Sequence, residues 1–140
     1  MQDTLLEIDG LSRIFPLGRG RALRAVDRVH LSIAEREVLG LVGESGSGKS
    51  TLGKTVLGLW EASEGEVRWR GEALPRRFAP SDFQRNAKRM QMIFQDPYSS
   101  LNPRMTVGEI VGEGLRLHTK LAGTEITRRV HEWLVRVGLH

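Results

Sequence analysis

The sequence predicts an α/β fold, and three consecutive features support this prediction. Residues 38–42 form a continuous apolar run of strand length, as expected of a parallel strand covered on both faces. A glycine-rich segment follows directly at residues 43–51. Beyond it, Leu52, Val56 and Leu59 recur at helical spacing. Strand, glycine loop and helix therefore follow one another in the order that anion binding at a helix N-terminus requires.

The chain before this segment predicts a small antiparallel sheet, to which one later strand returns. The β-prone or alternating segments are residues 4–8, 11–15, 22–26, 29–33 and 66–70. Turns are expected at residues 9–10 and 64–65, and residues 16–20 break the chain. Residues 22–26 and 29–33 alternate in the manner of a half-buried antiparallel strand around Asp27 and Arg28. Together these segments predict an antiparallel part that leads into the strand at residues 38–42.

The glycine-rich segment fits the phosphate-binding pattern G-x-x-x-x-G-K-[ST] at every fixed position. The candidate binding residues are Gly43, Glu44, Ser45, Gly46, Ser47, Gly48, Lys49, Ser50 and Thr51. Glycines reach positive φ without a Cβ penalty, so backbone N–H groups can turn inward around the β- and γ-phosphates of a nucleotide. Lys49 adds a positive charge, and the Ser50 hydroxyl is placed to ligate Mg²⁺. A Gly/Ser surface turn that happens to hold a lysine is the alternative.

Beyond the strand at residues 66–70 we expect a polar loop, a short helix and a second buried strand. Ser81 is the candidate cap of the short helix. Residues 90–94 are apolar and of strand length, and residues 95–103 are so dense in turn formers that they cannot continue that strand. The sequence therefore predicts a strand that ends in a loop at Gln95.

Two further helices are predicted near the end of the chain. Thr106 and Glu109 form a capping box for a helix that runs toward His118. Thr124 is the expected cap of the last helix, and Gly138 is a natural stop. The apolar face expected on that helix comprises Ile126, Val130, Trp133 or Leu134, and Val137. The i,i+4 ion pairs expected along it are Glu125 with Arg129 and Glu132 with Arg136.

Length and composition describe one ordinary globular domain, with 140 residues of which 39% are hydrophobic and 27% charged. No apolar run approaches the roughly 18 residues needed to span a bilayer, and the acidic N-terminus lacks the features of a signal peptide. We therefore expect a cytoplasmic chain that meets a membrane only through a partner. The absence of cysteine excludes disulfides and thiolate metal sites, and the four histidines show no ligand spacing. The net charge of +4 comes mainly from scattered arginines, which favours solvated surface over a nucleic-acid footprint.

Two runs of residues carry a resemblance to a known family. Residues 40–46 read Gly-Leu-Val-Gly-Glu-Ser-Gly, and residues 92–107 read Met-Ile-Phe-Gln-Asp-Pro-Tyr-Ser-Ser-Leu-Asn-Pro-Arg-Met-Thr-Val. With them the chain resembles the N-terminal half of the ATP-binding subunits of ABC transporters, particularly oligopeptide, dipeptide and nickel importers. The second run is the more discriminating of the two and looks like the Q-loop of that family.

The resemblance implies a P-loop NTPase core of the ABC ATPase type, with an N-terminal antiparallel β subdomain and the beginning of a helical subdomain. The implied divisions are 1–35 and 64–75 for the antiparallel part, 36–63 and 76–96 for the P-loop core, and 97–140 for the Q-loop and the start of the helical subdomain.

The resemblance also implies ligands, residue roles and partners. ATP and Mg²⁺ are the implied ligands. Gln95 would reach the metal and the γ-phosphate as a catalytic residue, and Phe15 would stack on adenine. An ordinary place for Phe15 in the sheet core is the alternative. The loop after Gln95 would face the transmembrane permease subunits on the inner side of the cell membrane, and a second ATPase subunit would complete the site.

Two departures from the family pattern bear on these expectations. Arg36 stands in the turn before the strand at residues 38–42, where the family commonly has glycine, so it needs another turn geometry or some strain. The L-S-G-G-Q signature, the Walker B strand and the switch histidine do not appear before Leu139 and His140. We therefore expect ATP hydrolysis to be incomplete in this chain alone, and we expect an open apolar sheet edge that favours self-association.

Two other functions remain open on the sequence. One is a P-loop ATPase linked to nucleic acid. The other is a truncated pseudo-subunit that docks on a membrane partner or on another ATPase without turnover.

Overall fold

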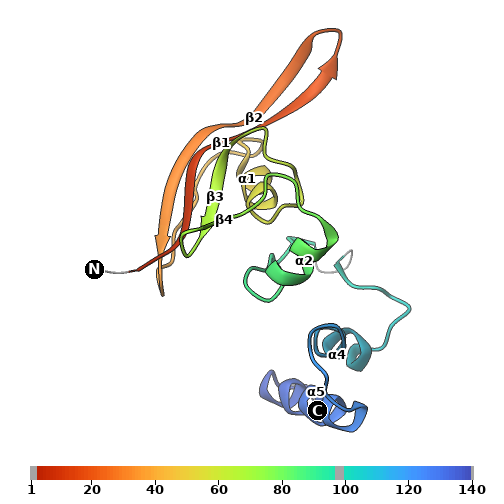
Figure 1. Cartoon of the computed structure of the whole chain (residues 1–140). Coiled ribbons are helices and arrows are strands. Elements are labelled where there is room, and N and C mark those ends of the chain that lie inside the picture. The colour runs from red at the N-terminus through yellow and green to blue at the C-terminus, as the bar shows by residue number, and fades with distance from the viewer. Residues whose placement is uncertain (1–2, 97–99, 140) are drawn as a thin grey trace. The chain divides into compact units, whose positions relative to one another are not determined.

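The computed structural model describes residues 3–96 and 100–139, in two compact units formed by residues 1–92 and 93–140 (Figure 1). The first unit contains strands β1 (Thr4–Gly18), β2 (Arg21–Ala34), β3 (Glu64–Trp69) and β4 (Glu72–Ala73) and helices α1 (Lys49–Val56) and α2 (Pro80–Asn86). The second contains helices α4 (Val107–His118) and α5 (Gly123–Arg136). Among the described residues, no helix combines the length and the apolar character needed to cross a bilayer.

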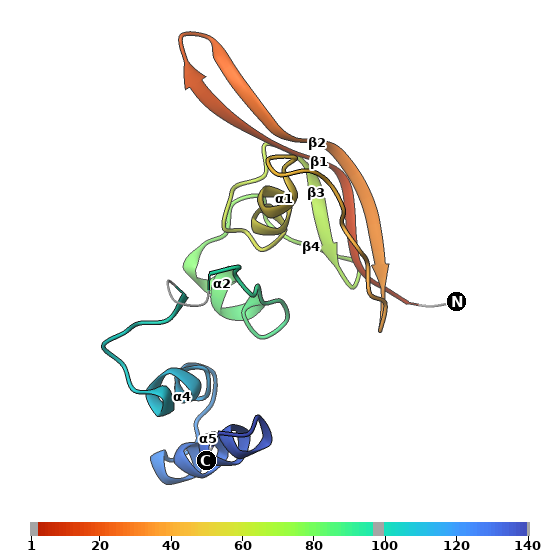
Figure 2. The same ribbon diagram turned by 180° about the vertical axis from the view of Figure 1, so that it is seen from behind.

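The strands of the first unit form one antiparallel sheet in the order β2-β1-β3-β4. Figures 1 and 2, which view the molecule from opposite sides, both show this sheet along one side of α1. The alternation of apolar residues along the strands turns one face toward the helix. The core between sheet and helix consists of Leu6, Ile8, Leu11, Val26, Leu52, Ala62, Val67 and Leu74. The predicted antiparallel part is confirmed.

Two turns that the sequence suggested inside this sheet are wrong. The strand expected around residues 27–28 is present as β2. β1 runs through residues 9–10, with register shifts between Ile8 and Leu11 and between Leu11 and Arg13. β3 likewise contains residues 64–65. A glycine at positive φ, such as Gly10 at 60°, serves a bulge as well as a turn, so the local pattern does not separate the two.

Ser12 stabilises this bulged region from a fully buried position. Its hydroxyl oxygen accepts a hydrogen bond from the Arg28 N–H at 3.0 Å, and its carbonyl accepts one from the Ser63 N–H at 2.9 Å. Arg28 has a φ of 44°, so it supplies the left-handed residue of the irregularity in β2. One short polar side chain thus satisfies a backbone donor that the bulge takes out of the ladder.

The buried strands expected at residues 38–42 and 90–94 are wrong for the structure described. Neither segment is assigned to a strand, and Val38, Val42 and Ile93 are each at least 95% exposed. A strand needs a neighbour for its backbone donors and acceptors, and within the described residues the sheet β2-β1-β3-β4 offers these segments no pairing. These two segments are therefore apolar but lack the paired strands that would bury them.

The helix after the glycine loop begins as predicted and ends earlier than Leu59. It starts at Lys49 and ends at Val56, and Gly58 follows with a φ of 75°. The Leu59 N–H donates to the Lys54 carbonyl at 2.9 Å, which is the closing bond of a glycine-terminated helix. A Cβ at Gly58 would lie 2.4 Å from the Phe78 ring, so packing as well as φ requires glycine there.

The short helix α2 is present, but its cap is Ala79 and not Ser81. The Ala79 N–H donates to the Asp82 carboxylate at 2.8 Å, so the acid in the first turn satisfies the end of the helix.

The capping box of α4 is confirmed. The Thr106 N–H donates to the Glu109 carboxylate at 2.7 Å, and the Glu109 N–H donates to the Thr106 hydroxyl oxygen at 3.3 Å. The hydrogen bonds from the Thr106 backbone and side chain lower the pKa of Glu109 from its ordinary value. The reciprocal bonds fix the start of the helix where the sequence placed it.

Helix α5 begins after Ala122, so the expected cap at Thr124 is wrong. Ile126 and Val130 are buried as expected of its apolar face, whereas Trp133 is 56% exposed. The predicted stop is confirmed by Gly138, which has a φ of 81° and is followed by a Leu139 N–H that donates to the Leu134 carbonyl at 2.9 Å.

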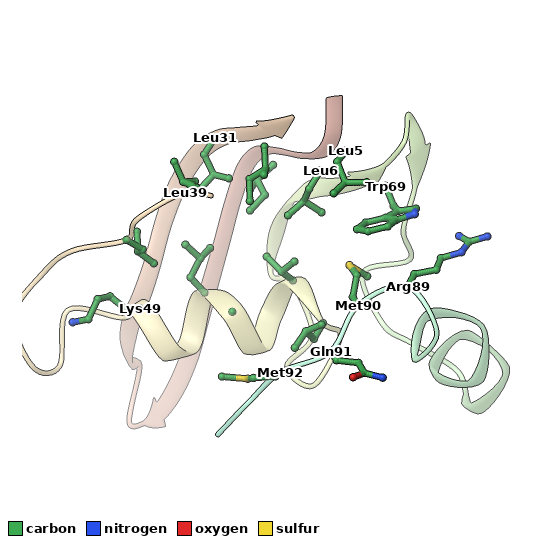
Figure 3. Close-up of a pocket in the computed structure, with 17 residues that line it drawn as sticks. Leu5, Leu6, Leu31, Leu39, Lys49, Trp69, Arg89, Met90, Gln91 and Met92 are labelled. Atoms are coloured by element: carbon green, nitrogen blue, oxygen red, sulfur yellow. The ribbon is translucent and has the colours of Figure 1, made fainter. Parts of the chain in front are cut away.

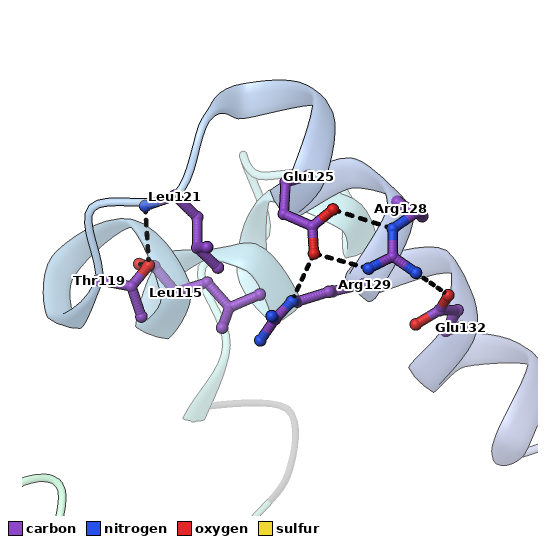
Figure 4. Close-up of polar contacts among 7 residues, drawn as sticks. All are labelled: Leu115, Thr119, Leu121, Glu125, Arg128, Arg129 and Glu132. Carbon is purple, nitrogen blue, oxygen red and sulfur yellow. Dashed lines mark hydrogen bonds and ion pairs between the residues drawn. The ribbon is translucent and has the colours of Figure 1, made fainter.

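An ion-pair network covers the outer side of α5 (Figure 4). The Glu125 carboxylate accepts hydrogen bonds from Arg128 and Arg129, and Arg128 also reaches Glu132. The expected pair of Glu125 with Arg129 is therefore confirmed, whereas Glu132 is paired with Arg128. The hydrogen bonds from Arg128 and then Arg129 lower the pKa of Glu125 from 4.5 to about 2.

Candidate functional site

The glycine loop at residues 43–51 is joined to the antiparallel sheet at Gly48. Gly48 has a φ of 93° and caps the N-terminus of α1. A Cβ built on it would lie 2.2 Å from the carbonyl oxygen of Ala25 in β2. Only glycine permits both the left-handed conformation and this close approach. The sheet therefore fixes the position at which the loop becomes a helix.

The side chain of Lys49 turns back into the loop that precedes it. Its ammonium group donates to the carbonyl oxygens of Gly43 at 2.7 Å and Glu44 at 2.6 Å, and to the Ser47 hydroxyl at 3.2 Å. These three bonds use the three protons of an ammonium group. A Cβ on Gly43 would lie 2.7 Å from the Ser47 hydroxyl oxygen, so the loop is also too tight for a larger residue there. The structure thus places a positive charge at the centre of a closed loop.

The beginning of α1 adds backbone donors to this charge. The first N–H groups of a helix lack partners inside the helix, and the helix dipole makes this end positive. No acidic residue lies in the first turn of α1, and residues 43–47 and Ser50 are solvent-exposed. Phosphate oxygens can therefore reach an electropositive loop whose donors are already oriented.

The donor set of the loop fits Mg²⁺ only together with phosphate. Among the described residues, no group of three or more histidine, cysteine, aspartate or glutamate side chains is arranged to hold a metal. Mg²⁺ prefers oxygen ligands and is commonly bound through one or two protein groups and the phosphates of a substrate. Ser50, an exposed hydroxyl in the first turn of α1, is the loop residue that fits this role.

Phe15 lies on β1, near the contact between β2 and the loop. It pairs with Leu23, which precedes Ala25 by two residues along β2. Its ring meets the Trp60 ring edge to face, with centroids 5.2 Å apart and an angle of 88° between planes. The guanidinium of Arg13 lies over the Phe15 ring at 4.4 Å. Sequence reasoning missed Arg13 and Trp60, because no local pattern connects residues so far apart in the chain.

A separate apolar cavity of about 490 Å³ lies between the sheet, α1 and residues 89–92 (Figure 3). Its lining includes Leu6, Leu39, Trp69 and Met90, and the Lys49 ammonium points away from it. An apolar lining offers nothing that would recognise a phosphate. We therefore place the candidate anion site at the loop and not in this cavity.

Gln95 belongs to the second unit, where it is exposed to solvent. Its role at the metal and the γ-phosphate stays a prediction. Part of the loop after Gln95, residues 97–99, lies outside the described residues. The residues that the structure brings together are those of the glycine loop, with Lys49 at their centre.

Comparison with known proteins identifies the family to which these features correspond. The family model described as ABC transporter matches residues 26–140. The oligopeptide transport ATP-binding protein OppF of Bacillus subtilis is 50% identical over 142 residues, which cover 100% of this chain and 46% of that protein. The OppF of Escherichia coli is 44% identical, over 96% of this chain and 43% of that protein. The chain thus spans less than half the length of these relatives.

Solved structures agree with this assignment. The dimeric structure of the ATP-binding cassette MJ0796 in a post-hydrolysis state, bound to ADP and Pi, superposes with a TM-score of 0.79 at 25% identity. The match covers 97% of this chain and 58% of that one. The structure of cbiO1 from Clostridium perfringens gives a TM-score of 0.76 at 24% identity, over 99% of this chain and 52% of that one. The fold is therefore part of an ABC ATPase cassette.

Proposed function

The chain belongs to the ABC transporter family, and from this premise we propose that it binds ATP with Mg²⁺ as part of the ATP-binding subunit of an oligopeptide importer. The observation that carries the proposal is the loop geometry around Lys49. Its ammonium lies inside a loop that contacts the sheet closely at Gly48, directly before the N-terminus of α1. This arrangement suits the β- and γ-phosphates of a nucleoside triphosphate.

Each residue of the proposed site has a separate task. Lys49 counters the phosphate charge, and the N–H groups at the start of α1 donate hydrogen bonds to phosphate oxygens. Ser50 would hold Mg²⁺, which, when bound, offsets phosphate charge and polarises the γ-phosphoryl group. Gln95, the proposed second metal contact and catalytic residue, would orient water and metal without anchoring the phosphates.

Calorimetric titration of the chain with ATP and Mg²⁺ tests the binding proposal. Lys49→Ala should weaken ATP binding by about 2–3 kcal/mol, the scale of losing a charged hydrogen-bond partner. Lys88→Ala is the matched control, because Lys88 is an exposed lysine in the same unit and outside the loop. Equal ATP affinity of the wild type and Lys49→Ala would reject the site.

The partners and the transport activity form a second part of the proposal. The B. subtilis and E. coli relatives are named as oligopeptide transport proteins, and the MJ0796 cassette was solved as a dimer. We infer that this chain works beside a second ATPase subunit, and that the loop after Gln95 meets a transmembrane permease. Hydrolysis of ATP would then drive uptake of a peptide.

A chimera tests this second part. This chain would replace the matching 46% of the B. subtilis OppF, and peptide uptake would be measured in cells that lack the native subunit. Restored uptake supports the proposal. Gln95→Ala in the chimera should leave ATP affinity unchanged and lower turnover. Unchanged turnover with the permease present would contradict the role of Gln95.

A further inference from the structure

Arg13, Phe15 and Trp60 form a compact cluster of one cation and two aromatic rings between β1 and the segment that follows α1. The Arg13 guanidinium lies 4.4 Å from the Phe15 ring centroid and 5.6 Å from the Trp60 ring centroid. The two ring centroids are 5.2 Å apart. Arg13 and Phe15 belong to β1, whereas Trp60 follows the C-terminal end of α1. The cluster therefore connects the sheet to the far end of the helix that begins at Lys49.

The three separations leave one face of the Phe15 ring clear of the other two side chains. These three distances form a nearly equilateral triangle. Arg13 and Trp60 therefore lie on the same side of the Phe15 ring and cannot cover its two opposite faces. The guanidinium lies over one face, and the perpendicular Trp60 ring meets Phe15 beside it. Phe15 as a whole is only partly buried. The second face of the ring is thus clear of Arg13 and Trp60.

Arg13 and the backbone of Trp60 are each held by a hydrogen bond. Arg13 Nη1 donates to the Glu61 carbonyl at 2.7 Å, and the backbone N–H of Trp60 donates to the Lys54 carbonyl at 3.3 Å. Arg13 Nε is buried and has no hydrogen-bond partner among the described residues. A guanidinium in this position is stabilised by the electron-rich faces of the two rings. The orientations of Arg13 and Phe15 therefore depend on each other.

We propose that Arg13 and Trp60 are positioning residues that hold Phe15 for stacking with the base of the bound nucleotide. The proposal rests on the proposed ATP binding at residues 43–51. A flat aromatic ring recognises the π-face of a purine without hydrogen bonds, and stacking requires that the ring keep its orientation. The Arg13 cation behind Phe15 and the Trp60 ring beside it fix that orientation.

Paired titrations with two ligands test this proposal. ATP carries a base, and inorganic tripolyphosphate carries only the phosphates. Arg13→Leu and Trp60→Leu should each weaken ATP binding about three- to tenfold and leave the affinity for tripolyphosphate unchanged. The conservative variant Trp60→Phe, which keeps an aromatic edge, should retain ATP affinity within about twofold of the wild type.

The second unit provides a matched control. Arg136 lies 4.9 Å from the centroid of the Trp133 ring on α5, so Arg136→Leu removes a similar contact within the second unit. It should change neither affinity. Unchanged ATP affinity in Arg13→Leu and Trp60→Leu would overturn the inference while ATP binding at Lys49 stands. An equal loss for both ligands would also overturn it, because a merely structural effect would not distinguish a base. Failure of the proposed function would give a different result, because Lys49→Ala would then bind ATP as tightly as the wild type.

Discussion

Replacing Gly48 with alanine should destabilise the first unit strongly, even with no nucleotide added. The Cβ would lie 2.2 Å from the Ala25 carbonyl oxygen, and the backbone at this position has a φ of 93°. Two separate penalties follow. Alanine must adopt a left-handed conformation, and either β2 or the start of α1 must move to relieve the overlap.

The size of the effect can be estimated from these two penalties. A left-handed conformation costs a residue with a Cβ about 1–2 kcal/mol. Overpacking at a site that must shift costs a further amount of about 1–3 kcal/mol. Together they predict a loss of about 2–5 kcal/mol, a large part of the roughly 5–15 kcal/mol that stabilises an ordinary domain.

Two other glycines calibrate the measurement. Gly46 has a φ of 82° with nothing within 4 Å of a built Cβ, so Gly46→Ala should incur only the conformational cost of about 1–2 kcal/mol. Gly53 lies inside α1, where the nearest atom to a built Cβ is the Met92 methyl carbon at 3.9 Å. Gly53→Ala should therefore stabilise the unit by about 1 kcal/mol.

Urea unfolding followed by tryptophan fluorescence provides the assay. The Trp133→Phe background leaves Trp60 and Trp69, both in the first unit, as reporters. The expected order of stability is Gly53→Ala, wild type, Gly46→Ala and Gly48→Ala. If Gly48→Ala were no less stable than Gly46→Ala, the contact with Ala25 would not be what requires glycine at this junction.

Three further predictions concern single side chains. Arg36→Gly should raise the free energy of unfolding by about 0.5–1 kcal/mol, because Arg36 has a φ of 63°; an unchanged urea midpoint would mean that its conformation carries no strain. Ser12→Ala should lower the free energy of unfolding by about 1–3 kcal/mol, since the backbone N–H of Arg28 loses its acceptor in the fully buried Ser12 hydroxyl. A loss below that range would show that water replaces the hydroxyl. Glu125 has a pKa lowered from 4.5 to about 2, so its contribution to stability is present above about pH 4.5 and is lost as the pH falls toward 2. Thermal unfolding of Glu125→Gln should therefore differ from the wild type at pH 7 and converge with it near pH 2; a difference that did not change with pH would reject the ion-pair explanation.

The features that the sequence predicted correctly are those set by neighbouring residues. The start of α1 follows from glycine and lysine spacing, the capping box of α4 from Thr106 and Glu109, and the end of α5 from Gly138. Each of these signals acts within one or two turns of chain. The antiparallel sheet was also predictable, because apolar residues alternate along the segments that the bulges separate.

The features that the sequence did not predict depend on distant partners. Residues 38–42 and 90–94 are apolar enough for buried strands, but composition cannot state which strand will pair with them. The glycine at residue 10 is compatible with a turn or a bulge, and only the partner strand decides between them. Similarly, the support of Phe15 by Trp60 requires the path of the whole chain from β1 to the end of α1.

The three hydrogen bonds of Lys49 also determine what phosphate binding would cost the loop. A flexible glycine-rich segment loses conformational entropy when it closes around a ligand, at roughly 1–2 kcal/mol for each residue fixed. Here Gly43, Glu44 and Ser47 already hold the ammonium group at 2.6–3.2 Å, so the loop is ordered before any anion arrives. Binding then becomes an exchange of acceptors at Lys49 instead of a disorder-to-order transition. Its heat-capacity change should be small, and its association rate should be limited by encounter and not by loop closure.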